Sequence, residues 1–155
     1  MPNITAMAAK MNREVAAGLA RHFQAMSPEK QTWQPLDAGR CALDQIQECA
    51  GINLWTAQML RDRAMPPIGE NWMQQLKTQY DTPEKALAGL QTGTDALIAA
   101  IEAFPAEHLD DTLQLPWDSA PSSLAEIMML AYWNMAYHLG QISYIQTLYG
   151  DRENH

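Results

Sequence analysis

The sequence predicts an all-α protein, a four-helix bundle with long irregular connections. Four long segments repeat apolar residues every three to four positions, which is the period of a helix with one apolar face. No segment alternates apolar and polar residues over the length of a half-buried strand. Amphipathic helices without a sheet bury their apolar faces against one another, so these observations together indicate a bundle.

The first two helices are expected over residues 4–26 and 42–63. Ser27 and Pro28 end the first helix, because a proline disfavours the helical conformation of the residue before it. The second helix carries two neighbouring apolar stripes, which favours a central position in the bundle. The stripes consist of Leu43, Ile46, Ala50, Asn53, Ala57 and Leu60, and of Ile52, Trp55 and Met59.

The third helix is expected to begin within the segment 81–84 and to run to about Phe104. It follows a proline-rich loop over residues 64–72 and a short helix through Tyr80. The segment 81–84 offers a capping side chain, then Pro83, whose missing N–H costs nothing in the first turn of a helix.

The fourth helix is expected over residues 123–149, after a long loop over residues 105–121. Ser123 and Glu126 have the spacing of a capping box, in which each side chain bonds the backbone N–H of the other residue. Gly150 is typical of the position that follows a helix.

Length and composition indicate a single domain over residues 1–155. A domain of this length buries roughly 70% of its unfolded surface, which is enough for one core. Hydrophobic residues make up 47% of the chain, which excludes a disordered protein. No apolar run reaches the ~18 residues of a membrane span, and the N-terminal residues lack the layout of a signal peptide. We therefore expect a cytoplasmic protein without a membrane partner.

The charge balance argues against a nucleic-acid partner. Lys and Arg number 10 and Asp and Glu number 18, which gives a formal net charge of −8. Proteins that bind DNA or RNA present a basic surface to the phosphates. The few arginines here are scattered along the chain and outnumbered by carboxylates.

The fourth helix carries polar residues within its apolar stripe. Asn134 and His138 are four residues apart, so they stack on one helical face and could hold one metal ion. They could equally be core polar groups with hydrogen-bond partners, as buried polar groups normally are. Glu48, inside the second helix, favours a site if it faces His138, because an ionised carboxylate is rarely buried without a partner. It could also point to solvent on the polar edge of its helix.

Two segments resemble the DinB/YfiT-like superfamily. NMAYHLGQISYIQTLYGD is similar to the last helix of that family, which reads roughly His-x-x-x-His-x-Gly-Gln-Ile, and matches it at His138, Gly140, Gln141 and Ile142. WQPLDAGRCALDQIQECA resembles the family's Trp-x-Pro, a short spacer and a helix with an inward histidine. The resemblance covers the whole chain in helix order.

The resemblance implies a four-helix bundle, usually a homodimer, in which three histidines bind a divalent metal such as nickel or zinc. Some relatives are thiol-dependent transferases or isomerases, and many have no assigned activity. Here Glu48 stands at the position of the second-helix histidine, and Asn134 at that of the first histidine of the last helix. Only His138 matches the family's ligands. A Glu48, Asn134 and His138 set still suits a divalent ion such as Ni, Zn or Mn, with lower affinity than three imidazoles.

Two functional hypotheses follow. In the first, the protein is a divalent-metal-dependent hydrolase or thiol transferase acting on a small molecule. The metal would lower the pKa of a bound water or thiol, with His138 as main ligand and Glu48 as ligand or general base. In the second, it is a non-catalytic dimeric helical bundle with a degenerate metal site. Apolar residues that flank the core stripe of the last helix are compatible with a homodimer in either case: Met129, Leu130, Trp133 and Tyr137.

Overall fold

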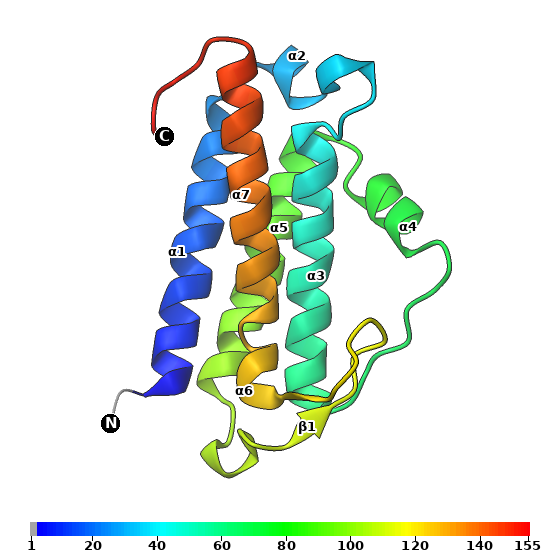
Figure 1. Cartoon of the computed structure of the whole chain (residues 1–155), viewed down its shortest axis with the longest axis vertical. Helices are drawn as coiled ribbons and strands as arrows, with labels where there is room; N and C mark the ends of the chain where they lie inside the picture. The colour runs from blue at the N-terminus through cyan, green and yellow to red at the C-terminus, as the bar shows by residue number, and fades with distance from the viewer. Residues whose placement is uncertain (1–2) are drawn as a thin grey trace.

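The computed structural model describes residues 3–155 and is dominated by four long helices (Figure 1). These are α1 (Ile4–Ala25), α3 (Ala42–Asp62), α5 (Pro83–Glu102) and α7 (Leu130–Leu148). Shorter elements connect them: α2 (Pro28–Gln31), η1 (Pro35–Asp37), α4 (Trp72–Gln79), η2 (Ala106–His108), β1 (Thr112–Leu113), β2 (Ser122–Ser123) and α6 (Leu124–Ile127). The first three predicted long helices are confirmed, each ending one or two residues earlier than expected.

The long helices pack as a bundle in which each touches two principal neighbours. Helix α3 packs against α5 and α7, and α1 packs against α5 and α7. Figure 1 shows that α1 and α7 run in one direction and that α3 and α5 run in the other. The connection from α3 to α5 must therefore cross the length of the bundle, and α4 lies on this crossover.

Capping side chains explain where the helices begin. Asn3 accepts hydrogen bonds from the backbone N–H groups of Thr5 and Ala6, which α1 cannot satisfy internally. Thr82 caps α5 in the same way through the N–H of Lys85. The capping box predicted at Ser123 and Glu126 is confirmed, with both reciprocal bonds in place.

The last helix differs from the prediction because it is divided. α6 ends at Ile127, and the chain turns through Met128 and Met129 before α7 begins. Asn12 of α1 donates its side-chain N–H to the carbonyl of Met128 at 3.0 Å, so a distant residue satisfies the backbone at the break. The two-residue ladder of β1 and β2 was also not predicted, since strands this short contain no alternation to detect.

Helices α3 and α5 approach each other closely at Gly93. A Cβ atom on Gly93 would lie 2.8 Å from the backbone oxygen of Ala50 and 3.1 Å from the Cβ of Asn53. The side-chain N–H of Asn53 also donates to the hydroxyl of Thr94 at 3.0 Å. Because Gly93 has no side chain, the backbone of α5 at this point can pack directly against the backbone of α3 at Ala50 and the side chain of Asn53.

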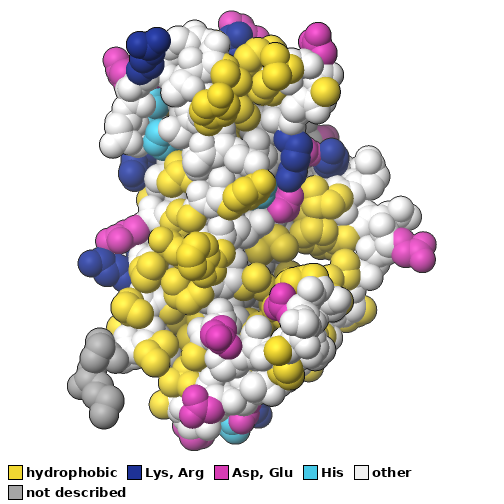
Figure 2. Space-filling model, in the orientation of Figure 1, with side chains coloured by type: hydrophobic (Ala, Val, Ile, Leu, Met, Phe, Trp, Pro, Cys, Tyr) yellow, Lys and Arg dark blue, Asp and Glu magenta, His cyan; other side chains and the backbone are white. Residues whose placement is uncertain are grey.

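One outer face of the bundle is strongly apolar. Figure 2 shows hydrophobic side chains gathered across α1 and the lower half of α7, and again where the upper end of α7 meets the segment between α2 and α3. The exposed apolar residues of α1 and α7 are Ile4, Met7, Trp133, Tyr137, Tyr144 and Leu148. Trp133 and Tyr137, expected to flank the core, have their side chains largely in solvent. No helix within residues 3–155 is long and apolar enough to cross a membrane.

Candidate functional site

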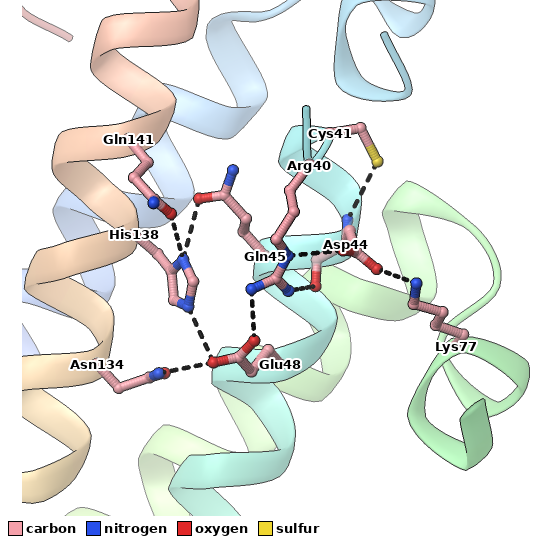
Figure 3. Close-up of polar contacts among 9 residues, drawn as sticks. All are labelled: Arg40, Cys41, Asp44, Gln45, Glu48, Lys77, Asn134, His138 and Gln141. Atoms are coloured by element: carbon pink, nitrogen blue, oxygen red, sulfur yellow. Dashed lines mark hydrogen bonds and ion pairs between the residues drawn. The ribbon is translucent and has the colours of Figure 1, made fainter. Parts of the chain in front are cut away.

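The structure brings the three predicted site residues together. One carboxylate oxygen of Glu48, Oε1, accepts hydrogen bonds from Nε2 of His138 at 3.0 Å and from Nδ2 of Asn134 at 2.9 Å. Glu48 projects from α3, and the other two project from the facing side of α7 (Figure 3). The side chain of His138 is 1% exposed and that of Glu48 is 19% exposed, so the contact lies at the edge of the core.

Arg40 completes the pairing of the Glu48 carboxylate. Its Nη1 lies 2.8 Å from Oε2 of Glu48, while its Nε donates to Asp44 at 2.8 Å. Asp44 also pairs with Lys77, at 2.6 Å. Each oxygen of Glu48 therefore has at least one charged or polar donor, and Arg40 supplies a positive charge within direct contact.

The second ring nitrogen of His138 also faces oxygen acceptors. Nδ1 lies 3.0 Å from Oε1 of Gln45 and 3.0 Å from Oε1 of Gln141. An imidazolium satisfies this arrangement with both of its N–H groups. A neutral ring fits it if one glutamine turns its NH₂ group towards Nδ1. We call the residues Arg40, Gln45, Glu48, Asn134, His138 and Gln141 the Glu48 cluster.

The cluster keeps Glu48 ionised. Burial by itself would raise the pKa of this carboxyl group, but the hydrogen bonds from His138, Asn134 and Arg40 outweigh it and bring the pKa from 4.5 to about 2. The carboxylate at neutral pH is thus held by donors on both of its oxygens. It has no free lone pair directed at the position between Asn134 and His138.

In the orientation that the structure gives them, these side chains do not present a set of metal ligands. Asn134 presents its NH₂ group to Glu48, although a metal ligand would have to present its oxygen. The Nε2 atom of His138 is directed at a carboxylate oxygen, and Arg40 places a fixed cation on the same carboxylate. Within residues 3–155, no group of three or more His, Cys, Asp and Glu side chains is gathered around one point.

One atom of the cluster lacks a partner. Oδ1 of Asn134 is buried and accepts no hydrogen bond from any residue that the structure describes. An acceptor left unsatisfied in this way costs free energy, on the order of 1–3 kcal/mol. Rotating the amide would bring this oxygen towards Glu48, where a cation would be needed between the two oxygens.

No activated nucleophile accompanies the cluster. Cys49 follows Glu48 in sequence, but its side chain is fully buried. Burial, and then the charge of Glu48, raise the pKa of the Cys49 thiol well above its usual value. The thiol is therefore protonated at neutral pH, and the reactive thiolate is not formed.

Sequence reasoning did not find Arg40 and Gln45. Arg40, Asp44 and Glu48 follow a four-residue spacing, which places them along one side of a helix and its N-terminal extension. Gln45 lies three residues before Glu48 and so shares its face. That spacing is the signal that could have identified both residues as neighbours of Glu48.

Comparison with known proteins shows a similarity of fold and no similarity of sequence. No known protein-family model matches the sequence, and neither does any curated protein. Among solved structures, the chain is similar to the crystal structure of an uncharacterized protein from Clostridium difficile 630, with a TM-score of 0.77 and 10% sequence identity. The match covers 96% of this chain and 98% of that chain. The two proteins therefore share the whole arrangement of helices.

Proposed function

We propose that this chain is a DinB/YfiT-like bundle with a degenerate metal site, and that it acts as a non-catalytic homodimeric protein. The observation that carries the proposal is the carboxylate of Glu48, paired with Arg40 on one oxygen and with Asn134 and His138 on the other. In this interpretation, the positive charge that a metal would supply comes from Arg40. The residues at the family's ligand positions then stabilise the α3–α7 contact.

Charge balance supports this proposal. A divalent ion would have to be bound beside a guanidinium that lies 2.8 Å from the same carboxylate. Metal binding also requires a neutral imidazole with a free lone pair, whereas both nitrogens of His138 face oxygens. The network as it stands leaves only one of its buried atoms unsatisfied, so it needs no further ion for its stability.

The apolar face of α1 and α7 supports a homodimer. Ile4, Met7 and Trp133 are all exposed, and the side chain of Trp133 is 69% exposed. Large apolar side chains gathered on one surface are typical of protein interfaces. A second copy of this chain is the partner that the family resemblance implies, and the same surface on both copies would give a twofold interface.

Elemental analysis of protein purified without a metal-affinity tag tests the proposal. We expect less than a tenth of an equivalent of metal per chain, roughly, after dialysis against nickel, zinc or manganese, because the donors are already paired. A matched positive control is the double variant Glu48→His and Asn134→His, which provides three imidazoles. This variant should bind one nickel or zinc ion, as shown by isothermal titration calorimetry.

A second candidate is a divalent-metal-dependent hydrolase or thiol transferase acting on a small molecule. The unpartnered Oδ1 of Asn134 favours it, because a rotated amide would add a third ligand beside Glu48 and His138. A stoichiometric ion in the wild-type protein, lost in His138→Ala, would favour this candidate over the first. The control is Gln24→Ala, a substitution on the exposed surface of α1.

A further inference from the structure

The Glu48 cluster borders an open groove of about 740 Å³ that has no place in the proposed function. One wall is the outer side of α7, and the opposite wall is the segment 35–39 that precedes α3. Most of the lining is apolar, with Tyr137, Tyr144 and Leu148 along α7. Arg40, Gln45 and Gln141 supply the polar part. The volume is within the ~300–1,000 Å³ typical of small-molecule sites.

Gln45 directs an unused donor into this groove. Its Oε1 is engaged by His138, but its Nε2 donates to no residue that the structure describes. The residue is 1% exposed, so only a group that enters the groove can reach it. Figure 3 shows the side-chain nitrogen of Gln45 turned away from His138, into the space between Gln141 and Arg40. Because this nitrogen has no partner among the described residues, it is available to an acceptor that enters the groove.

Gly140 opens the apolar wall. A Cβ atom built on it would meet nothing within 4 Å, so the packing of this chain does not require a glycine there. A glycine in the middle of a helix is unfavourable, because it loses more backbone entropy than any other residue. Its position between Tyr137 and Tyr144 gives the groove a floor at backbone level. A glycine at this point leaves room for another molecule to approach the helix backbone closely.

The opposite wall holds an apolar side chain in solvent. Leu36 and Asp37 have φ values of 55° and 59°, in the left-handed region that non-glycine residues seldom occupy. Leu36 is 92% exposed, yet it lines the groove. A ligand that lay between Leu36 and α7 would cover this side chain, and strained backbone of this kind persists at ligand-binding sites.

We infer that this groove binds a small monocarboxylate with an apolar body, with its head group at Gln45, Gln141 and Arg40 and its body between Leu36 and Tyr144. A carboxylate offers about four acceptor positions, which suits the two free amide NH₂ groups and the N–H groups that Arg40 does not already use. A small head group that enters the groove reaches Gln45 directly.

The surroundings of the head group are close to neutral. Arg40 and Lys77 balance Asp44 and Glu48, and His138 adds further donors. The inference rests on the proposed function in one respect, since His138 must keep Nδ1 on the oxygen of Gln45 so that the NH₂ group faces the groove. Carboxylate binding and metal binding are measured in separate experiments. One result can therefore contradict the groove inference without contradicting the proposed function, and the reverse also holds.

Isothermal titration calorimetry with decanoate, on full-length protein dialysed against EDTA, tests the inference. We expect one decanoate bound per chain, and decylammonium, which has the same apolar body and a donor head, to bind at least about tenfold more weakly. Non-specific binding would favour the cation, because the chain has a net charge of −8. A preference for decanoate over decylammonium therefore indicates specific binding in the groove.

The variant Gly140→Leu places an apolar side chain in the groove at a position where a Cβ atom meets nothing within 4 Å. It should weaken decanoate binding by about tenfold or more, while the control Gln24→Leu, which adds the same side chain to an exposed site on α1, leaves it unchanged. Equal binding of the two ligands, or unchanged binding by Gly140→Leu, would overturn the inference. So would a change in sedimentation coefficient caused by Gly140→Leu, since the groove would then belong to a contact between copies.

Discussion

At the scale of single residues, Glu48 governs the cluster because three side chains donate to its two oxygens. Removing its charge leaves Arg40 and His138 without their common partner. Donors left in this way at the edge of a core cost more than the hydrogen bonds themselves contribute. The contact between α3 and α7 therefore depends on one ionised carboxylate.

The first prediction concerns the pH dependence of stability. The pKa of Glu48 falls from 4.5 to about 2 on folding, so its contribution is complete above pH 4.5 and is lost as the pH falls towards 2. A change of this size corresponds to roughly 3 kcal/mol. The variant Glu48→Gln should be less stable than the wild type by about this amount at pH 7. Urea unfolding in EDTA should show the difference narrowing between pH 4.5 and pH 2.

The comparison isolates Glu48 from other carboxyl groups. Asp44 also has a lowered pKa, because Lys77 and Arg40 outweigh the effect of its burial, and it titrates in both proteins. Both carboxylates pair with Arg40, so only the part of the Asp44 contribution that is independent of Glu48 cancels in the difference. A gap between the wild type and Glu48→Gln that stayed constant from pH 7 to pH 2 would contradict the assignment of the lowered pKa to Glu48.

At the scale of helices, two glycines in comparable helix interiors have opposite environments. A Cβ atom on Gly93 would lie 2.8 Å from the backbone oxygen of Ala50. A backbone atom in a helix cannot move aside without a large cost in free energy. Gly140 faces open space. The same substitution should therefore have opposite effects at the two positions.

The second prediction uses this pair. Gly93→Ala should destabilise the protein by about 1–3 kcal/mol, because the added methyl forces α3 and α5 apart. Gly140→Ala should stabilise it by about 0.5–1 kcal/mol, since only the gain in helix propensity remains. Thermal unfolding followed by circular dichroism measures both. If Gly93→Ala were as stable as the wild type, the close approach of α3 and α5 would be wrong.

The long helices could be predicted from the sequence because each repeats its apolar period over many residues. The break at Met128 could not be predicted, because Asn12, which donates to the buried carbonyl oxygen of Met128, is 116 residues away in the sequence. The contact of Glu48 with Asn134 and His138 was one of two alternatives that the helical faces allowed, the other being a Glu48 side chain in solvent. The contact of Arg40 with Glu48 was not predicted. Arg40 precedes α3, so the loop before that helix, and not the helical period, determines where its side chain points.

At the scale of the whole molecule, the apolar face of α1 and α7 and the net charge of −8 act against each other in a homodimer. Burial of apolar side chains favours association, and the repulsion between two acidic chains opposes it. Salt screens the repulsion and leaves the apolar contribution in place. A dimer formed through this face should therefore become more stable as the salt concentration rises.

The third prediction concerns Trp133. The variant Trp133→Glu places a charge within the proposed interface and should convert the dimer to a monomer, as measured by sedimentation velocity. Gln24→Glu adds the same charge at an exposed site of α1 and should remain dimeric. A wild-type protein that sediments as a monomer at every salt concentration would contradict the proposed homodimer.

The parallel pairing of α1 and α7 also has a consequence for synthesis of the protein. The bond between Asn12 and Met128 joins residues near opposite ends of the chain, so α1 acquires this neighbour only after almost every other helix has left the ribosome. Until then, the sides of α1 and α3 that will pack on α7 remain uncovered. Uncovered apolar surface makes a nascent chain prone to aggregation. Ribosome-stalled chains that stop before residue 124 should accordingly be captured by chaperones, and full-length chains should be released.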